Sequence, residues 1–372
     1  MKRVLNWPQV LAFRLTRHHL LNRNPADPVT VSRDVCGLQA QLPSAAELQL
    51  WARIDGISRK EIYSALLESR TLVKTSCMRH TLHLIPAAEF FVYINALRPS
   101  RIRELRRIMA YFGVTEKDAD GVTEAVVDAL SGGPMTRREL TEQSLSRMKT
   151  GKKVRAWFEQ SWWGVIRQGM VEGLVCYGPE RDGEATYVRV DQWLQKQKNV
   201  PEREAQQVLL RRYLSGYGPA TLTDFRRWSG ISGAELGAIW ESLKKELVEV
   251  SVEGKKTFLL RKDHDQLAQS SFDVPSVQLL PHFDPYMLGH SEKGHLVSPA
   301  RYKQVYRKAG WISPVVLLNG RVTGVWSYTR RGKRFSLKVE PFERISKTIR
   351  AKIEEKAASL GDFLGTSWEI KF

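Results

Sequence analysis

Two glutamines near the start of the chain carry side chains that could hold a water molecule or the polar edge of a substrate. Gln39 and Gln41 lie in the segment CGLQAQLP, residues 36–43, and a neutral amide supplies an acceptor oxygen and an NH₂ donor group. In a regular helix, residues two apart diverge by about 200°. Pro43 disfavours helix at the residue before it, and in an extended segment residues two apart lie on one side. We therefore expect a helix over 31–41 that frays at its end and lets the two glutamines converge.

The same segment has a plainer interpretation. Glutamine is a good helix former, and Gln39 and Gln41 flank an apolar stripe that contains Val31, Val35 and Leu38, so they could simply rim a buried face. If the helix does end here, its last carbonyl groups carry a partial negative charge that favours a nearby cation. The pattern alone leaves both interpretations open.

Other chemically useful residues give weaker signals. Asp284, in the segment FDPY, is the best candidate for a buried carboxylate, although an Asx-turn that caps its own backbone fits equally well. His80 and His83 would lie on opposite faces of a strand, so we expect no metal site there. The three cysteines form no CxxC pair and indicate free buried thiols. The sequence has no P-loop, GxGxxG or GxSxG motif, and we expect no cofactor.

The balance of charges favours an anionic partner. The chain has 372 residues, with 58 Lys and Arg against 40 Asp and Glu, and a net charge of +18. Nucleic acid is the simplest partner for such a surface. A basic surface can also serve only to keep the protein soluble, or it can meet a membrane surface. No apolar run approaches the roughly 20 residues of a membrane-spanning helix, and the start shows no secretion signal. We therefore expect a cytoplasmic protein without a membrane partner.

Three basic clusters are candidates for contact with a nucleic-acid backbone. They lie on a predicted helix over 98–112, at the start of a helix over 154–170, and at a hairpin tip over 328–335. Dense Arg and Lys suit phosphate contacts, which add affinity without reading sequence, although each cluster could also be only a solvated face. The candidates are Arg98, Arg101, Arg103, Arg106, Arg107, Lys149, Lys152, Lys153, Arg155, Arg330, Arg331, Lys333 and Arg334.

The elements that must position these residues form a weak repeat. Residues 121–190 predict three helices and a hairpin, and residues 203–261 repeat this order with the same Gly-Pro-x-Thr entry into the second helix. In the first of these copies Thr136 and Glu139 form a capping box. Three helices followed by a hairpin are typical of a winged helix-turn-helix domain. A degenerate copy is predicted nearer the N-terminus, with helices over 7–21, 31–41 and 58–70 and a hairpin over 71–86.

The remaining residues are β-rich. Segments 277–288, 313–328 and 333–342 predict strands, Asn319-Gly320 predicts a type I′ hairpin turn, and a helix over about 343–360 follows. The expected fold class is α+β, mostly α, with three tandem winged helix-turn-helix domains followed by a β-rich C-terminal unit and a terminal helix. The expected divisions are a first winged helix over 1–98, an Arg-rich connecting helix over 99–118, winged helices over 119–198 and 199–268, and the β-rich unit over 269–372.

Four blocks of the sequence, taken together, resemble a known family. The blocks are GLQAQ (37–41), MRHTLHLIPAAEF (78–90), LLPHFDPYMLGH (279–290) and VVLLNGRVTGVW (315–326). They resemble the AlkZ/YcaQ-like family of bacterial winged-helix DNA glycosylases, and their order and spacing match that family along essentially the whole chain. The resemblance implies tandem winged helices with a small β-rich part, and a nucleoid-associated bacterial enzyme. Three winged helices in one chain can surround DNA without a partner, so we expect a monomer.

The resemblance also implies a site and a reaction. Gln39 and Gln41 would be the catalytic pair of a monofunctional glycosylase that removes N7-alkylated purines from duplex DNA and, in some members, unhooks interstrand crosslinks. They would position water and stabilise an oxocarbenium-like sugar. The chain departs from the family pattern in the run SEKGHLV (291–297), where an Arg-Asp-Arg-like run is expected, and at His80, where glycine is common. Weaker candidates for lining the cleft are Asp284, Tyr286, Arg79 and His83.

Two other classes of protein remain open. The first is a non-catalytic winged-helix protein that regulates or shapes DNA. A regulator usually dimerises to read two half-sites, and the sequence shows no coiled-coil heptads. The second is an RNA-binding protein, which would prefer structured RNA over duplex DNA.

Overall fold

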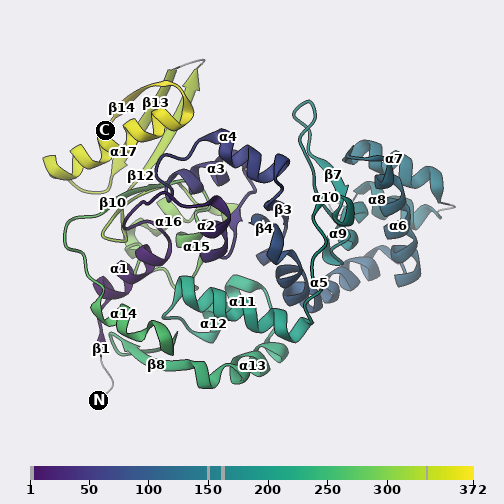
Figure 1. Ribbon diagram of the computed structural model, residues 1–372, viewed down its shortest axis with the longest axis horizontal. Coiled ribbons are helices and arrows are strands. Elements are labelled where there is room, and N and C mark those ends of the chain that lie inside the picture. The colour runs from purple at the N-terminus through teal and green to yellow at the C-terminus, as the bar shows by residue number, and fades with distance from the viewer. Residues whose placement is uncertain (1–3, 149–150, 161–163, 332–333) are drawn as a thin grey trace.

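The computed structural model describes residues 4–148, 151–160, 164–331 and 334–372. The chain is α+β, with four separate sheets that have strand orders β1-β8-β9, β2-β4-β3, β5-β7-β6 and β10-β11-β12-β13-β14. Figure 1 shows a large body that holds both ends of the described chain and a smaller lobe, built from α6 to α9 and β7, to one side of it.

The first part of the chain forms helices around a three-stranded sheet. Asn6 caps the start of helix α1, and its side chain and that of Gln9 make a reciprocal capping box. A second box, between Ser58 and Glu61, caps the start of α4. The elements are α1 Trp7–Arg17, α2 Pro28–Asp34, β2 Leu38–Gln39, α3 Pro43–Trp51, α4 Arg59–Tyr63 with a π-helical turn over Ser64–Glu68, β3 Leu72–Ser76 and β4 Leu82–Pro86.

The expected helix over 31–41 is wrong in its second half. Helix α2 ends at Asp34 because Cys36 and Gly37 take left-handed conformations, with φ of 57° and 92°, which a right-handed helix cannot contain. Pro43, expected to end a helix, stands in the first turn of α3, where its missing N–H costs nothing. Gln39 therefore lies in a short strand between two helices, and Gln41 lies in the bend that follows this strand.

A long helix links this part to the second unit. Helix α5 spans Phe90–Phe112 with Pro99 inside it. The capping box of Thr136 and Glu139 is confirmed, whereas the helix expected over 154–170 is described as two helices. The elements are α6 Glu116–Ala129, β5 Met135–Thr136, α7 Arg137–Arg147, α8 Lys152–Gln160, α9 Gly164–Val171, β6 Val175–Tyr177 and β7 Thr186–Arg189.

The third unit borrows a strand from the start of the chain. Strand β1, Val4–Leu5, lies parallel to β8. Thr221, with Asp224 as its partner, caps the second helix of this unit. The other elements are α10 Val190–Trp193, α11 Glu202–Tyr217, α12 Leu222–Ser229, α13 Gly233–Ser242, β8 Leu247–Val252, β9 Lys255–Leu260 and α14 His264–Gln269.

The C-terminal unit is a five-stranded sheet covered by a helix. Asn319 and Gly320, with φ of 49° and 77°, form the predicted tight turn between β11 and β12. The final strand, which the sequence did not predict, runs parallel to β13. The elements are β10 Val277–Leu280, α15 Pro285–Leu288, α16 Tyr302–Val305, β11 Val315–Leu318, β12 Arg321–Arg331, β13 Arg334–Pro341, α17 Lys347–Leu364 and β14 Ser367–Lys371.

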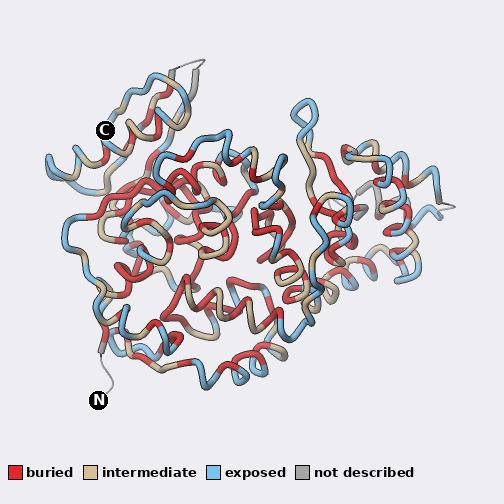
Figure 2. Tube along the Cα trace, viewed as in Figure 1, coloured by how far each residue is buried: buried red, intermediate tan, exposed pale blue. Residues whose placement is uncertain are grey.

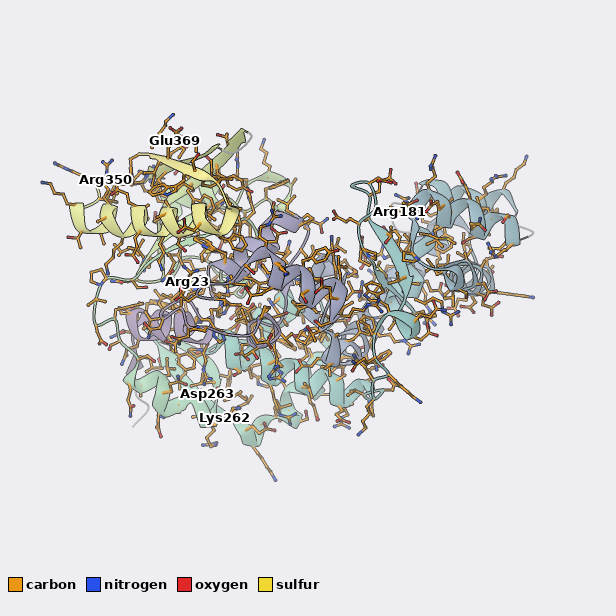
Figure 3. All side chains as sticks on the ribbon, turned by 45° about the horizontal axis from the view of Figure 1, so that its top comes forward. Arg23, Arg181, Lys262, Asp263, Arg350 and Glu369 are labelled. Carbon is orange, nitrogen blue, oxygen red and sulfur yellow. The ribbon has the colours of Figure 1, made fainter. Side chains whose placement is uncertain are left out.

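The hydrophobic cores do not follow the linear order of the units. The largest core joins side chains of α1 to α4 to those of the C-terminal sheet and α17, as the buried centre of the large body shows (Figure 2). Arg23, below α17 in Figure 3, spans the same boundary, since its Nη2 donates to the Trp51 carbonyl and its Nη1 to the Ser359 hydroxyl. The second unit packs with the end of α5 around its own core. The assignment of the units as winged helices and their boundaries stay predictions.

Candidate active site

Gln39 is held on three sides at the edge of the first sheet. It lies in β2 opposite His83 of β4, and 5% of its surface is exposed. Its side-chain Oε1 accepts a hydrogen bond from Arg79 Nη2 at 3.3 Å, and its backbone carbonyl accepts one from Gln49 Nε2 at 3.0 Å. These contacts fix both the backbone and the amide of Gln39.

Gln41 lies two residues further on, in the bend between β2 and α3, and is exposed. Its Oε1 lies 3.5 Å from the Leu82 backbone N–H, and the intervening Ala40 donates its own N–H to the Leu82 carbonyl at 2.7 Å. The two glutamines therefore meet the same end of β4, as an extended backbone requires. The strand replaces the frayed helix end that we expected, so no helix C-terminus contributes charge at this point.

Arg79 and His83 are the two weaker candidates that the structure brings to Gln39. Arg79 takes a left-handed φ of 53°, and its Nη1 donates to the Trp228 carbonyl at 2.7 Å. Burial lowers the pKa of Arg79 to about 10, so it remains a cation at neutral pH. Burial, with the charge of Arg79, lowers the pKa of His83 to about 3, so His83 is neutral there and donates Nδ1–H to the Thr81 carbonyl.

Asp284 and Tyr286 do not line a cleft, which corrects that expectation. The carboxylate of Asp284 is fully buried and accepts two hydrogen bonds from the guanidinium of Arg53, at 2.8 and 2.7 Å. It also caps the N–H of Tyr286, so the Asx-turn interpretation is right as well. Tyr286 is 3% exposed and donates its hydroxyl to the Gly320 carbonyl at 3.1 Å. The polar groups of both side chains are therefore hydrogen-bonded within the fold.

The arginine-rich helix divides into inward and outward residues. Arg101 is 4% exposed and donates to the carbonyl and hydroxyl of Ser76, so it cannot contact a phosphate, contrary to our expectation. Arg103 pairs with Glu235, and Arg106 pairs with Glu116. Among the described side chains, Arg98 and Arg107 are exposed without an ion pair.

The other two basic clusters are described only in part. Lys152, Lys153 and Arg155 are exposed around the first turn of α8. Lys149 and Lys333 lie outside the described residues. Arg330, Arg331 and Arg334 belong to β12 and β13, but their side chains also lie outside the description. DNA contact by these residues stays a prediction.

Gln49 is a contact of the glutamine segment that sequence reasoning missed. Its side chain is fully buried, and its Nε2 donates both to the Gln39 carbonyl and, at 3.3 Å, to the His282 carbonyl. Its Oε1 has no hydrogen-bond partner among the described residues. Gln49 belongs to α3, and that helix was itself missed because Pro43 also fits the end of a helix, so no local signal identified it.

The arrangement supplies one amide oxygen bonded to the Arg79 cation, that of Gln39, and a second amide oxygen, that of Gln41, at the neighbouring end of β4. Across the residues that the structure describes, no group of three His, Cys, Asp or Glu side chains could hold a metal ion, and no helix is long and apolar enough to cross a membrane. The three thiols, Cys36, Cys77 and Cys176, are buried and free, as expected. Neutral amides accept hydrogen bonds without taking up protons, so the groups gathered here suit the orientation of water better than acid–base catalysis.

Comparison with known proteins decides the class of enzyme. A family model described as DNA glycosylase AlkZ-like matches residues 33–363. The chain belongs to the AlkZ-like DNA glycosylase family. It is 32% identical over 378 residues to an interstrand DNA cross-link repair glycosylase of Streptomyces sahachiroi, covering 97% of each chain. It also matches the solved structure of Streptomyces sahachiroi DNA glycosylase AlkZ, with a TM-score of 0.85, 30% identity and full coverage of both chains.

These findings confirm the family that the four sequence blocks indicated. The chain is a DNA glycosylase, an enzyme of DNA repair that hydrolyses N-glycosidic bonds, and its substrate is DNA. The alternatives of a non-catalytic DNA-binding protein and of an RNA-binding protein are thereby set aside.

Proposed function

We propose that this glycosylase removes cationic N7-alkylated purines from duplex DNA and also unhooks interstrand crosslinks that such lesions form. The observation that carries the proposal is the pair Gln39 and Gln41 at one sheet edge, with Arg79 bonded to the first of them. The cross-link repair activity in the name of the Streptomyces sahachiroi relative supports the second substrate.

The chemistry of the lesion explains how neutral residues would suffice. Cleavage of an N-glycosidic bond normally needs an acid that helps the base to leave. An N7-alkylpurine already carries a positive charge, so its base is a good leaving group before the enzyme acts. The enzyme must then place a water molecule near C1′ and stabilise the oxocarbenium-like sugar, and neither task needs a titrating group.

In the proposed mechanism, Gln39 holds the water and Gln41 completes its position. A carbonyl oxygen has two acceptor sites, so Gln39 Oε1 keeps one for a water proton while Arg79 Nη2 occupies the other. The long contact of Gln41 Oε1 with the Leu82 N–H, 3.5 Å, leaves that amide free to turn towards the same water. The partial negative charges of both oxygens face the developing sugar cation.

The reaction would be monofunctional, because water rather than an amine attacks C1′. The DNA strand then stays intact at the abasic site until alkali or another enzyme cleaves it. Strand integrity before alkali treatment is therefore part of the expected result.

The test is base release from duplex DNA that carries one N7-methylguanine and, in parallel, one nitrogen-mustard crosslink. Gln39→Ala and Gln41→Ala should each slow release by about 100-fold or more, by analogy with the loss of one group that stabilises a transition state. Their affinity for the duplex should stay within about threefold, because neither residue carries charge. Gln195 is exposed like Gln41, and Gln195→Ala is the matched control that should keep the wild-type rate. Wild-type release with equal rates in all variants would move the reaction away from these residues.

A further inference from the structure

A hollow in the C-terminal unit is lined by residues in and after α16 and by His282, which precedes α15. Its volume is about 770 Å³. Three of its lining side chains are basic and three are aromatic rings. They are Lys303, Arg307, Lys308, His282, Tyr306 and Trp311.

This hollow is joined to Gln39 by a short chain of contacts. Gln49 Nε2 donates to the carbonyls of both Gln39 and His282. The ring of His282 lies 5.6 Å from that of Trp311 at an interplanar angle of 82°, and its Nδ1–H donates to the Ile312 carbonyl at 2.7 Å. One buried glutamine therefore separates the catalytic segment from the wall of the hollow.

The basic residues of the hollow are free to meet an anion. Lys303, Arg307 and Lys308 are all exposed, and within the described part of the chain none of them forms an ion pair. By contrast, Arg103 and Arg106 of α5 are each engaged by a carboxylate. Unpaired cations around one concave surface concentrate a positive potential there, and phosphate contacts are their commonest use in DNA-binding proteins.

Trp311 is placed in a way that burial does not explain. Its side chain is 44% exposed, although it also packs on Phe283 with ring centroids 5.3 Å apart. The preceding residues, Ala309 and Gly310, take left-handed φ values of 56° and 76°, and an alanine in this region is strained. The tight turn presents the indole at the mouth of the hollow.

We propose that this hollow binds the DNA strand beside the nucleotide under attack, with Lys303, Arg307 and Lys308 on phosphates and Trp311 stacked on a base. The inference rests on the proposed function for the use of Gln39 as the reaction centre. It adds a second binding site on the same strand, fixed to that centre through Gln49. Aromatic rings accept any base, because every base has a π-face, so the site favours duplexes whose stacking is already broken.

The basic residues are tested by the salt dependence of binding. The probes are an intact duplex and the same duplex with a tetrahydrofuran abasic-site analogue. The triple variant Lys303→Gln, Arg307→Gln, Lys308→Gln should lower the slope of log affinity against log salt by about 2 to 3, since each neutralised phosphate contributes about 0.9. The control replaces Lys196, Lys198 and Lys262, which are exposed outside the hollow; Lys262 lies at the lower edge in Figure 3. This control variant removes the same amount of charge and should leave the salt slope nearly unchanged. Equal slopes in both triple variants would overturn the proposal.

Trp311 is tested by the preference for the abasic duplex. Trp311→Ala should reduce that preference by about tenfold, and Trp311→Phe should restore most of it, because one stacked base contributes a factor of about 5 to 150. Circular dichroism checks that each variant is folded, and the phenylalanine variant keeps the packing on Phe283. An unchanged preference in a folded Trp311→Ala would overturn the stacking role.

The same variants separate this inference from the proposed function. If the wild type releases N7-methylguanine and every hollow variant binds DNA as the wild type does, the proposed function stands and the proposed DNA-binding role of the hollow is wrong. Absence of release by the wild type, with the expected losses of binding, would overturn the proposed substrate while the hollow stands as a DNA site.

Discussion

The buried ion pair of Arg53 and Asp284 indicates that Asp284 stabilises the fold and does not act on the substrate. Both side chains are fully enclosed and share two hydrogen bonds. Removing one charge strands the other in the interior, which typically costs 3–5 kcal/mol. We therefore expect Asp284→Asn to lower the free energy of unfolding by roughly 3–5 kcal/mol in urea titrations.

A double variant controls for the loss of shape. Arg53→Met with Asp284→Leu leaves no charge unpaired and should recover much of that stability. A folded and fully stable Asp284→Asn that no longer releases base would show instead that Asp284 acts on the substrate.

Lys293 is a buried basic residue whose surroundings, unlike those of Asp284, oppose its charge. Its Nζ donates to the Met287 carbonyl at 2.8 Å beneath the ring of Tyr306. Burial, and then the charge of Arg79, lowers the pKa of Lys293 from 10.5 to about 7. Between these two values the unfolded chain binds a proton that the folded chain does not, so stability should rise with pH across this window.

The measurement is urea unfolding of the wild type and of Lys293→Met at pH 6.5 and pH 9. The variant should show less gain in stability between the two values, and its advantage over the wild type should be greater at the lower pH, where most of the folded molecules carry the buried charge. Equal gains in both proteins would mean that Lys293 does not carry the effect.

Individual elements show which sequence signals specify structure locally and which do not. The capping box at Thr136 and the turn at Asn319-Gly320 were predicted and are present, because each signal acts within a few residues. At Pro43 the prediction of a helix end is wrong, because proline fits both the end of a helix and the first turn of the next one.

Contacts between remote elements could not be predicted from local patterns. Strands β1 and β14 each pair in parallel with a strand from another part of the chain. Of the site, Gln39, Gln41, Arg79 and His83 were named from the family resemblance, and the structure places Arg79 and His83 beside Gln39. The hairpin that contains β4 follows from local alternation, whereas β2 lies where a helix was expected. Gln49 reaches them only through tertiary packing of α3.

Helix α5 offers a direct test of the division between inward and outward arginines. Arg101→Gln should lower the free energy of unfolding by about 1–3 kcal/mol, because the buried carbonyl and hydroxyl of Ser76 lose a charged donor. The pair Arg98→Gln and Arg107→Gln, exposed on the same helix, should leave stability unchanged and lower the salt slope of DNA binding by about 2. Urea unfolding and binding titrations measure the two effects, and an unchanged slope would make the outer face of α5 only a solvated surface.

At the scale of the whole molecule, the position of the site depends on a core that joins distant parts of the chain. Leu11, Leu15 and Val31 pack in one cluster with Val277 and Trp326. The strand with Gln39 and the hollow with Trp311 are consequently held by the same packed interior, which fixes their distance more firmly than a flexible linker between two domains would.

The second unit differs, because the described residues of its main core lie within 105–187, while Cys176 and Val188 pack in the neighbouring core. We therefore expect a fragment over 99–190 to fold alone, with a cooperative thermal transition by circular dichroism. A fragment over 1–98 should not fold, because its apolar residues lack the C-terminal partners that cover them in the whole chain. Adding the separate fragment 269–372 should restore structure to 1–98 if the shared core is what stabilises it. Cooperative folding of 1–98 without that partner would show that the first unit is independent and that the site does not depend on the shared core.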